Sequence, residues 1–288
     1  MTEALSEPRI IVLPDPESVS RHAAELVAAG LVDAVAARGR ADWATTSGST
    51  PIGIYRALAE APLRDAIRWE RVHVWFGDDR YVPRDHPLSN VLPADQVLAA
   101  SSARAGLSGR GATGIDVEAG IEPGAPLPPG NLHPFPCTTA IAEGRGAAWA
   151  AATYAEELRS AVRLSDDGWP VFDLVLVGIG PDGHLLSVFP GSPALASRDL
   201  ALAIPAPTHV EPHVERVTLN PAILGAAAGV LAVVNGDGKA DVLARIFGPE
   251  RNPAALPAQL ARRTGATWVI DTAAAARLSG EVPTERVT

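Results

Sequence analysis

The chain has little cysteine, no long apolar run and a deficit of positive charge. Cys137 is the single cysteine among 288 residues, so an internal disulfide is excluded and a reducing compartment, the cytoplasm, is expected. No run approaches the roughly 18 apolar residues of a membrane span, and the N-terminus lacks a signal-peptide pattern. The net charge of −9 argues against a general nucleic-acid binder. We therefore expect neither a membrane nor a nucleic acid as partner, and an anionic ligand would need a few local donors.

Several familiar catalytic motifs are also missing. The sequence has no P-loop lysine and no G-x-G-x-x-G, which argues against a nucleoside triphosphate or a dinucleotide. It has no G-x-S-x-G elbow, so a serine nucleophile is not expected. Asp78 and Asp79 lack further ligands at a definable spacing, and His86 lies in a stretch typical of a loop. We expect no metal and no cofactor.

Short apolar runs alternate with stretches of helical period. The predicted strands are 9–14, 42–48, 71–80, 172–179, 215–220, 229–235 and 266–271. The predicted helices are 16–39, 51–60, 90–101, 140–162 and 239–247. This alternation indicates an α/β fold, Rossmann-like, with a parallel-rich central sheet and helices on both faces. Residues 102–136 form a Gly/Pro-rich excursion, and because each side alone would lack a closed sheet, we expect one domain over 1–288.

Four of the predicted strands end in glycine and polar side chains. The segments are "TSGSTP", "GDDR", "GPDGH" and "NGDGK". Ligands of parallel α/β sheets bind beyond the carboxyl ends of the strands. One such end would be an ordinary turn, whereas four favour a single site.

Two of these segments, taken alone, allow an ordinary structural explanation. Thr50 as N-cap and Pro51 as first helical residue would make a standard helix start, while Gly48 and Ser49 could instead direct backbone N–H groups at a phosphate. Lys239 is either an exposed lysine at a helix start or the partner of a bound anion.

The "GDDR" and "GPDGH" segments carry groups suited to catalysis. Arg80 offers a guanidinium fork for a phosphate or an oxyanion, although it could equally belong to a solvated ion-pair cluster. Asp182 stands two residues before His184, and a carboxylate that binds one ring nitrogen leaves the other as a base. A lone histidine is more often structural, so these residues alone leave both readings open. Ser187 falls in "LLSVFPG", which we predict to be a buried packing segment.

Taken together, these motifs resemble the 6-phosphogluconolactonase family, which shares its fold with glucosamine-6-phosphate deaminase and, more distantly, ribose-5-phosphate isomerase. The resemblance covers most of the chain and rests on "TSGSTP", "GDDRYVPRDHPLSN", "NLHPFP", "VGIGPDGHLLSVFPGSP", "RVTLN" and "GDGKADVL". It implies hydrolysis of 6-phospho-D-glucono-1,5-lactone, a sugar-phosphate lactone, by a monomer or homodimer without a cofactor.

The resemblance also implies roles for individual residues. His184 matches the general base, Asp182 its orienting carboxylate, and Arg80 a substrate-binding arginine that could stabilise the oxyanion. The implied substrate-binding residues are Gly48, Ser49, Thr50, Asp78, Lys239 and Arg216.

The chain departs from the family pattern at several positions. Asp79 replaces a common glutamate, Leu185 and Leu186 replace Thr-Ala, and Thr46 and Ser47 replace a Ser-Gly pair. None of these changes removes a proposed catalytic group.

Two rival functions remain open. The deaminase relative has a tyrosine where Arg80 stands and a glutamate after its Asp-Gly-His, and "LLSVFPG" has no carboxylate. A non-enzymatic sugar-phosphate sensor would carry an N-terminal DNA-binding helix pair, for which a first strand starting near residue 9 leaves no room.

Overall fold

The computed structural model describes residues 7–99 and 124–287. Its strands are β1 Arg9–Leu13, β2 Ala41–Thr45, β3 Val72–Phe76, β4 Asp78–Arg80, β5 Leu132–His133, β6 Leu174–Gly178, β7 Ala201–Ile204, β8 Arg216–Leu219, β9 Val230–Val234, β10 Ala266–Asp271 and β11 Glu285–Arg286. Its α-helices are α1 Pro16–Arg38, α2 Ser49–Leu58, α3 Leu63–Ala66, α4 Val91–Val97, α6 Cys137–Ala142, α7 Ala147–Ala161, α8 Ile223–Ala226 and α9 Ala240–Ile246.

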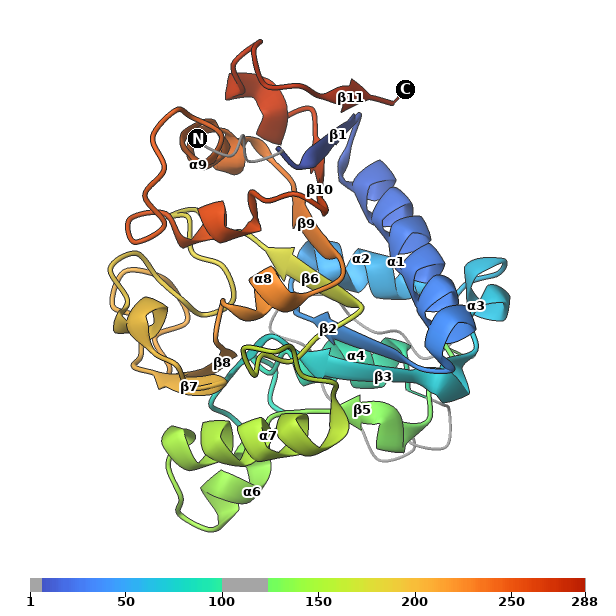
Figure 1. Cartoon of the computed structure of the whole chain (residues 1–288), viewed down its shortest axis with the longest axis vertical. Coiled ribbons are helices and arrows are strands. Elements are labelled where there is room, and N and C mark those ends of the chain that lie inside the picture. Colours follow the sequence, from blue (N-terminus) through green and yellow to red (C-terminus); the bar gives the residue numbers. More distant parts are fainter. Residues whose placement is uncertain (1–6, 100–123, 288) are drawn as a thin grey trace.

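Eight strands form a parallel sheet in the order β11-β1-β10-β9-β6-β2-β3-β5. Every residue of β2 and of β9 is buried, as expected for central strands covered on both faces. Figure 1 shows α1 and α2 on one side of these strands and α7 on the other. The predicted α/β class with a parallel sheet is therefore confirmed.

Helix α1 illustrates how local sequence sets the element bounds. The side chain of Asp15 accepts a hydrogen bond from the Ser18 N–H at 2.8 Å, and Pro16 occupies the first turn. Gly39 ends the helix in the left-handed conformation at φ 75°. The buried residues follow the helical period and pack on α2 and on β1, β2, β6, β9 and β10.

The strand predicted over 71–80 is wrong as a single element. It divides at Gly77 into β3, which belongs to the parallel sheet, and β4, which pairs with β8 in a second, antiparallel sheet of order β4-β8-β7. The N–H of Gly77 still bonds to the Thr45 carbonyl of the first sheet at 2.7 Å, while its carbonyl accepts from Leu219 N–H at 2.7 Å. The chain thus changes sheets at this glycine, and the predicted strand 215–220 lies outside the parallel sheet.

Two predicted helices also differ from the structure. The helix expected over 140–162 is two helices, α6 and α7, because Gly144 takes φ 65° and interrupts the hydrogen-bond ladder. The helix expected over 90–101 ends at Val97, and its last two residues lie outside the described part. Residues 102–123 of the excursion also lie outside the described part, while its end contributes β5 to the edge of the sheet.

The fold brings the four polar strand ends together. The strands concerned, β9, β6, β2 and β3, are consecutive neighbours in the parallel sheet. Their carboxyl ends therefore meet along one edge, with the small antiparallel sheet beside them (Figure 1). No helix in the described part of the chain is both long and apolar enough to span a membrane.

Candidate active site

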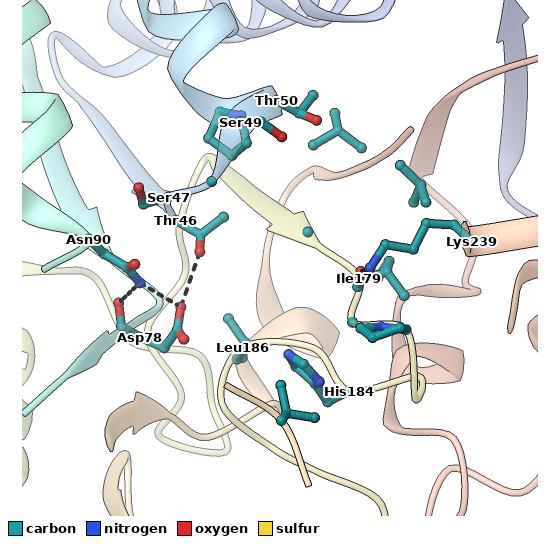
Figure 2. A pocket seen from close by; sticks show the side chains of 18 of the residues that line it. Thr46, Ser47, Ser49, Thr50, Asp78, Asn90, Ile179, His184, Leu186 and Lys239 are labelled. Atoms are coloured by element: carbon teal, nitrogen blue, oxygen red, sulfur yellow. Dashed lines mark hydrogen bonds between the residues drawn. The ribbon is translucent and has the colours of Figure 1, made fainter. Parts of the chain in front are cut away.

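A cavity of about 310 Å³ lies at the carboxyl ends of these strands. Its lining contains every predicted site residue except Asp182: Gly48, Ser49, Thr50, Asp78, Arg80, His184, Arg216 and Lys239. Figure 2 shows Asp78 and Asn90 on one side of the cavity, Lys239 on the other, and Ser49 and Thr50 at the start of a helix. The groups at the four strand ends thus share one cavity.

The start of α2 forms one wall of the cavity. Gly48 is the N-cap of α2, so the prediction of Thr50 as N-cap is wrong. The φ of Gly48 is 134°, a backbone conformation that glycine adopts readily and other residues rarely do. The side-chain hydroxyl of Thr50 instead accepts a hydrogen bond from the Asn235 amide at 2.9 Å, which ties α2 to the end of β9. The N–H groups of Ser49 and Thr50 belong to the first helical turn, where intrahelical acceptors are missing and an anion is favoured.

The two neighbouring aspartates of "GDDR" face opposite sides of β4. Asp78 lines the cavity and is buried. Its carboxylate accepts hydrogen bonds from the Ser187 hydroxyl at 2.6 Å and the Thr46 hydroxyl at 3.1 Å. It therefore connects three segments that are distant in the sequence and builds the cavity floor.

Asp79 points away from the cavity and holds the segment that follows. It accepts hydrogen bonds from the backbone N–H of Asn90 at 2.6 Å and from the Ser89 hydroxyl at 3.1 Å. Burial raises the pKa of Asp79 to about 7, against the lowering effect of the hydrogen bonds from the backbone N–H groups of Asn90 and Arg80. Its role in the structure is to place Asn90 beside Asp78.

Arg80 and Arg216 form a cross-strand pair between β4 and β8, and both line the cavity. Arg80 donates to the Asn90 side-chain oxygen, and Arg216 donates to the Pro212 carbonyl at 3.1 Å. The Nε atoms of both arginines are buried and have no hydrogen-bond partner in the described part of the chain. Burial lowers the pKa of Arg216, and the charge of Arg80 acts in the same direction. Two adjacent guanidinium groups that line one cavity favour an anion between them.

His184 and Asp182 form a hydrogen-bonded pair in the turn that follows β6. Nδ1 of His184 lies 2.6 Å from Oδ1 of Asp182, which also accepts the His184 backbone N–H at 3.1 Å. Burial raises the pKa of Asp182, but the hydrogen bonds and charge of His184 outweigh it and hold this pKa below its usual range. Asp182 itself lies behind His184, outside the cavity lining. The pairing fixes a tautomer that leaves Nε2 of His184 available as a base.

The ammonium group of Lys239 sits beside this pair. Its Nζ donates to the Ile179 carbonyl at 2.8 Å, at the end of the strand that leads to His184. Burial lowers the pKa of Lys239, whereas the negative charge of Asp182 raises it. In total three cationic side chains and two carboxylates, Asp78 and Glu211, line the cavity, although the chain as a whole is acidic.

Sequence reasoning missed several groups around the cavity. Ser187 is buried as predicted, but its segment does more than pack, since its hydroxyl binds Asp78. Asn90, Asn235 and Glu211 also line the cavity. Asn90 belongs to a quoted motif and could have been found there, whereas Glu211 lies in a segment without any such signal.

A second group of histidines belongs to another part of the molecule. Nδ1 of His73 lies 2.9 Å from Nε2 of His133, and Nδ1 of His133 lies 2.8 Å from Glu157. Burial lowers the pKa of His73 to about 4, with the charges of Arg40 and His133 contributing. None of these residues lines the cavity, so the "NLHPFP" motif contributes to packing at β5. Within the described residues, no three His, Cys, Asp or Glu side chains form a cluster that could bind a metal.

The chain is similar to several proteins named 6-phosphogluconolactonase. A 6-phosphogluconolactonase from Synechocystis sp. is 32% identical over 270 residues, which cover 92% of this chain and 95% of the relative. One from Streptomyces coelicolor is 31% identical over 272 residues, covering 94% and 95%. The crystal structure of a 6-phosphogluconolactonase from Thermotoga maritima matches with a TM-score of 0.67 at 26% identity, covering 92% of this chain and 100% of that one.

The family match extends across nearly the whole chain. Residues 14–270 match the family described as "Glucosamine-6-phosphate isomerases/6-phosphogluconolactonase". This range contains β2 to β9 and every residue of the cavity described above. The chain therefore belongs to the family of glucosamine-6-phosphate isomerases and 6-phosphogluconolactonases.

Proposed function

We propose that this protein hydrolyses 6-phospho-D-glucono-1,5-lactone to 6-phospho-D-gluconate. The observation that carries the proposal is that His184, hydrogen-bonded to Asp182, and the guanidinium groups of Arg80 and Arg216 line one cavity. A base beside an anion-binding wall suits attack of water on an ester carbonyl. The relatives named 6-phosphogluconolactonase support the same substrate class.

His184 is the general base of the proposed reaction. With Nδ1–H bound to Asp182, Nε2 takes a proton from water as the water oxygen attacks the lactone carbonyl carbon. The tetrahedral intermediate then expels the ring oxygen, which receives the proton from His184, and the open carboxylic acid ionises. Positioned proton transfer of this kind contributes about 10²–10⁴-fold to the rate.

The cationic side chains serve two parts of the substrate: the phosphate, and the carbonyl oxygen that becomes an oxyanion during the reaction. Arg80 stabilises the oxyanion that forms at the carbonyl, an interaction typically worth about 3–4 kcal/mol. The start of α2 and Lys239 hold the phosphate, and Arg216 adds a further cation. Phosphate binding fixes the ring relative to His184, so binding energy remote from the carbonyl lowers the barrier.

We also propose that residues 1–288 act as one domain, as a monomer or homodimer in the cytoplasm. A continuous hydrophobic core supports the proposal of a single domain. The single cysteine, Cys137, supports a reducing compartment such as the cytoplasm. Light scattering coupled to gel filtration would reveal any assembly larger than a dimer.

A coupled assay tests the proposed activity. Glucose-6-phosphate dehydrogenase generates the lactone, and its disappearance is followed with and without the protein. We expect His184→Ala to lower kcat by about 10²–10⁴-fold while substrate binding changes little. Turnover of His184→Ala at the wild-type rate would overturn the assignment of the base. Ammonia release from glucosamine 6-phosphate without lactone hydrolysis would overturn the function itself.

A further inference from the structure

A second histidine binds the carboxylate that orients His184. His209 lies in the segment between β7 and β8, far from the "GPDGH" turn in the sequence. Its Nε2 lies 3.0 Å from Oδ2 of Asp182, whereas His184 occupies Oδ1 of the same carboxylate at 2.6 Å. Asp182 thus bridges two imidazole rings that come from two different loops.

An aromatic ring holds the two imidazoles in place. The ring of Phe189 lies 4.6 Å from that of His184 and 5.5 Å from that of His209, the latter in an edge-to-face contact at 77°. The guanidinium carbon of Arg216 lies 5.8 Å from the centre of the same ring. Edge-to-face aromatic contacts are directional, so Phe189 limits the orientations that His209 can adopt.

We propose that His209 is a positioning residue for His184 that acts through Asp182, in the lactone hydrolysis proposed above. With its proton on Nε2, His209 donates to Oδ2 and keeps the carboxylate in the rotamer that receives Nδ1–H of His184.

The contact also links the base to the wall of the cavity. Val210 and Glu211, the two residues after His209, line the cavity beside His184. The bond from His209 to Asp182 therefore anchors this wall to the turn that carries the base. Sequence spacing gives no sign of the link, because 27 residues separate the two partners.

The charged groups around Asp182 determine what the pH profile of a His209 variant reports. Those that act on it are His184 in its own turn, His209 in the β7–β8 segment and Lys239 before α9. Glu211 pairs with His213 at 3.0 Å, and the guanidinium group of Arg216 lies over the ring of Phe189. Removing His209 leaves the other charges in place, so a change in the pH profile reports the loss of its bond to Asp182.

The test compares His209→Ala with His209→Gln. Alanine removes the donor, while the glutamine amide can reach the position of Nε2 and cannot ionise. We expect His209→Ala to lower kcat about three- to tenfold, as for one lost hydrogen bond, with little change in KM. The pH profile of kcat/KM should change in His209→Ala as well, and His209→Gln should restore both kcat and the profile. His213→Ala is the matched control, because His213 binds the Pro207 carbonyl and Glu211.

An activity-independent measurement separates this proposal from the proposed function. Nitrogen-15 NMR of the His184 ring reports the share of the Nδ1–H tautomer, which should fall in His209→Ala and recover in His209→Gln. This shift is expected even if wild-type protein hydrolyses no lactone, a result that would overturn only the proposed function. An unchanged tautomer and pH profile in His209→Ala, or a loss that His209→Gln does not recover, would overturn the positioning role.

Discussion

Gly180 lets the ring of His184 reach Asp182, and replacing it with alanine should disable the site. A Cβ atom at position 180 would lie 2.1 Å from Nδ1 and 2.2 Å from Cε1 of His184. Ordinary contact begins at 3.4 Å, so the imidazole ring has to move by about 1 Å or more. That movement breaks the 2.6 Å bond to Asp182, which selects the tautomer.

The expected loss is large in rate and modest in stability. A misplacement of about 1 Å costs on the order of 10²-fold in rate, within the range of about 10²–10⁴-fold for a lost general base. The free energy of unfolding should fall by only about 1–3 kcal/mol, because one hydrogen bond of a side chain near the surface is lost. The variant should therefore fold and still bind substrate.

The coupled lactone assay and urea denaturation together check this prediction. Gly238→Ala is the matched control, since a Cβ there meets no atom of the described residues within 4 Å and this glycine does not line the cavity. We expect wild-type kcat for the control and a loss of about 100-fold or more for Gly180→Ala. A folded Gly180→Ala variant with wild-type kcat would refute the argument that the ring position of His184 limits catalysis.

Three further predictions concern stability. Ser187→Ala should lower the free energy of unfolding in urea by about 1–3 kcal/mol, because the buried Asp78 carboxylate loses its 2.6 Å donor. An unchanged free energy of unfolding would contradict a stabilising role of the Ser187–Asp78 hydrogen bond. Gly53→Ala should cost about 1–3 kcal/mol by the same measurement, since its Cβ would lie 2.6 Å from the Ser20 hydroxyl, and Ser20→Gly should recover part of that loss. Burial lowers the pKa of His73 from 6.5 to about 4, so between these pH values the unfolded chain binds more protons and stability falls as the pH drops. Because His73 is partly exposed, the free energy of unfolding should fall by only on the order of 1–2 kcal/mol. Urea titrations at several pH values should show a weaker pH dependence in His73→Gln.

Local sequence predicts those parts of the fold that depend on neighbours in the chain. The N-cap Asp15 and the C-cap Gly39 bound α1 within one residue of the predicted helix, because capping involves residues only a few positions apart. The apolar run of β9 predicts that central strand, since burial on both faces leaves no polar position in it.

Elements that depend on a distant partner were not predictable from local pattern. Strand β4 has three residues and exists because β8, more than a hundred residues later, pairs with it. The same pairing sets Arg80 against Arg216, so the two-guanidinium wall is a product of the antiparallel sheet. No spacing in the sequence specifies this register.

The sequence by itself determined which chemical groups stand at the strand ends, because a parallel sheet exposes its carboxyl ends and polar residues there need a ligand or a partner. It also determined the pairing of His184 with Asp182, whose two-residue spacing suffices for the hydrogen bond. Only the tertiary structure decided that Asp78 and not Asp79 faces the cavity, and that His209 reaches Asp182. The physical reason is that these contacts arise from the pleat of a short strand and from the packing of two loops on Phe189, and both depend on residues distant in the chain.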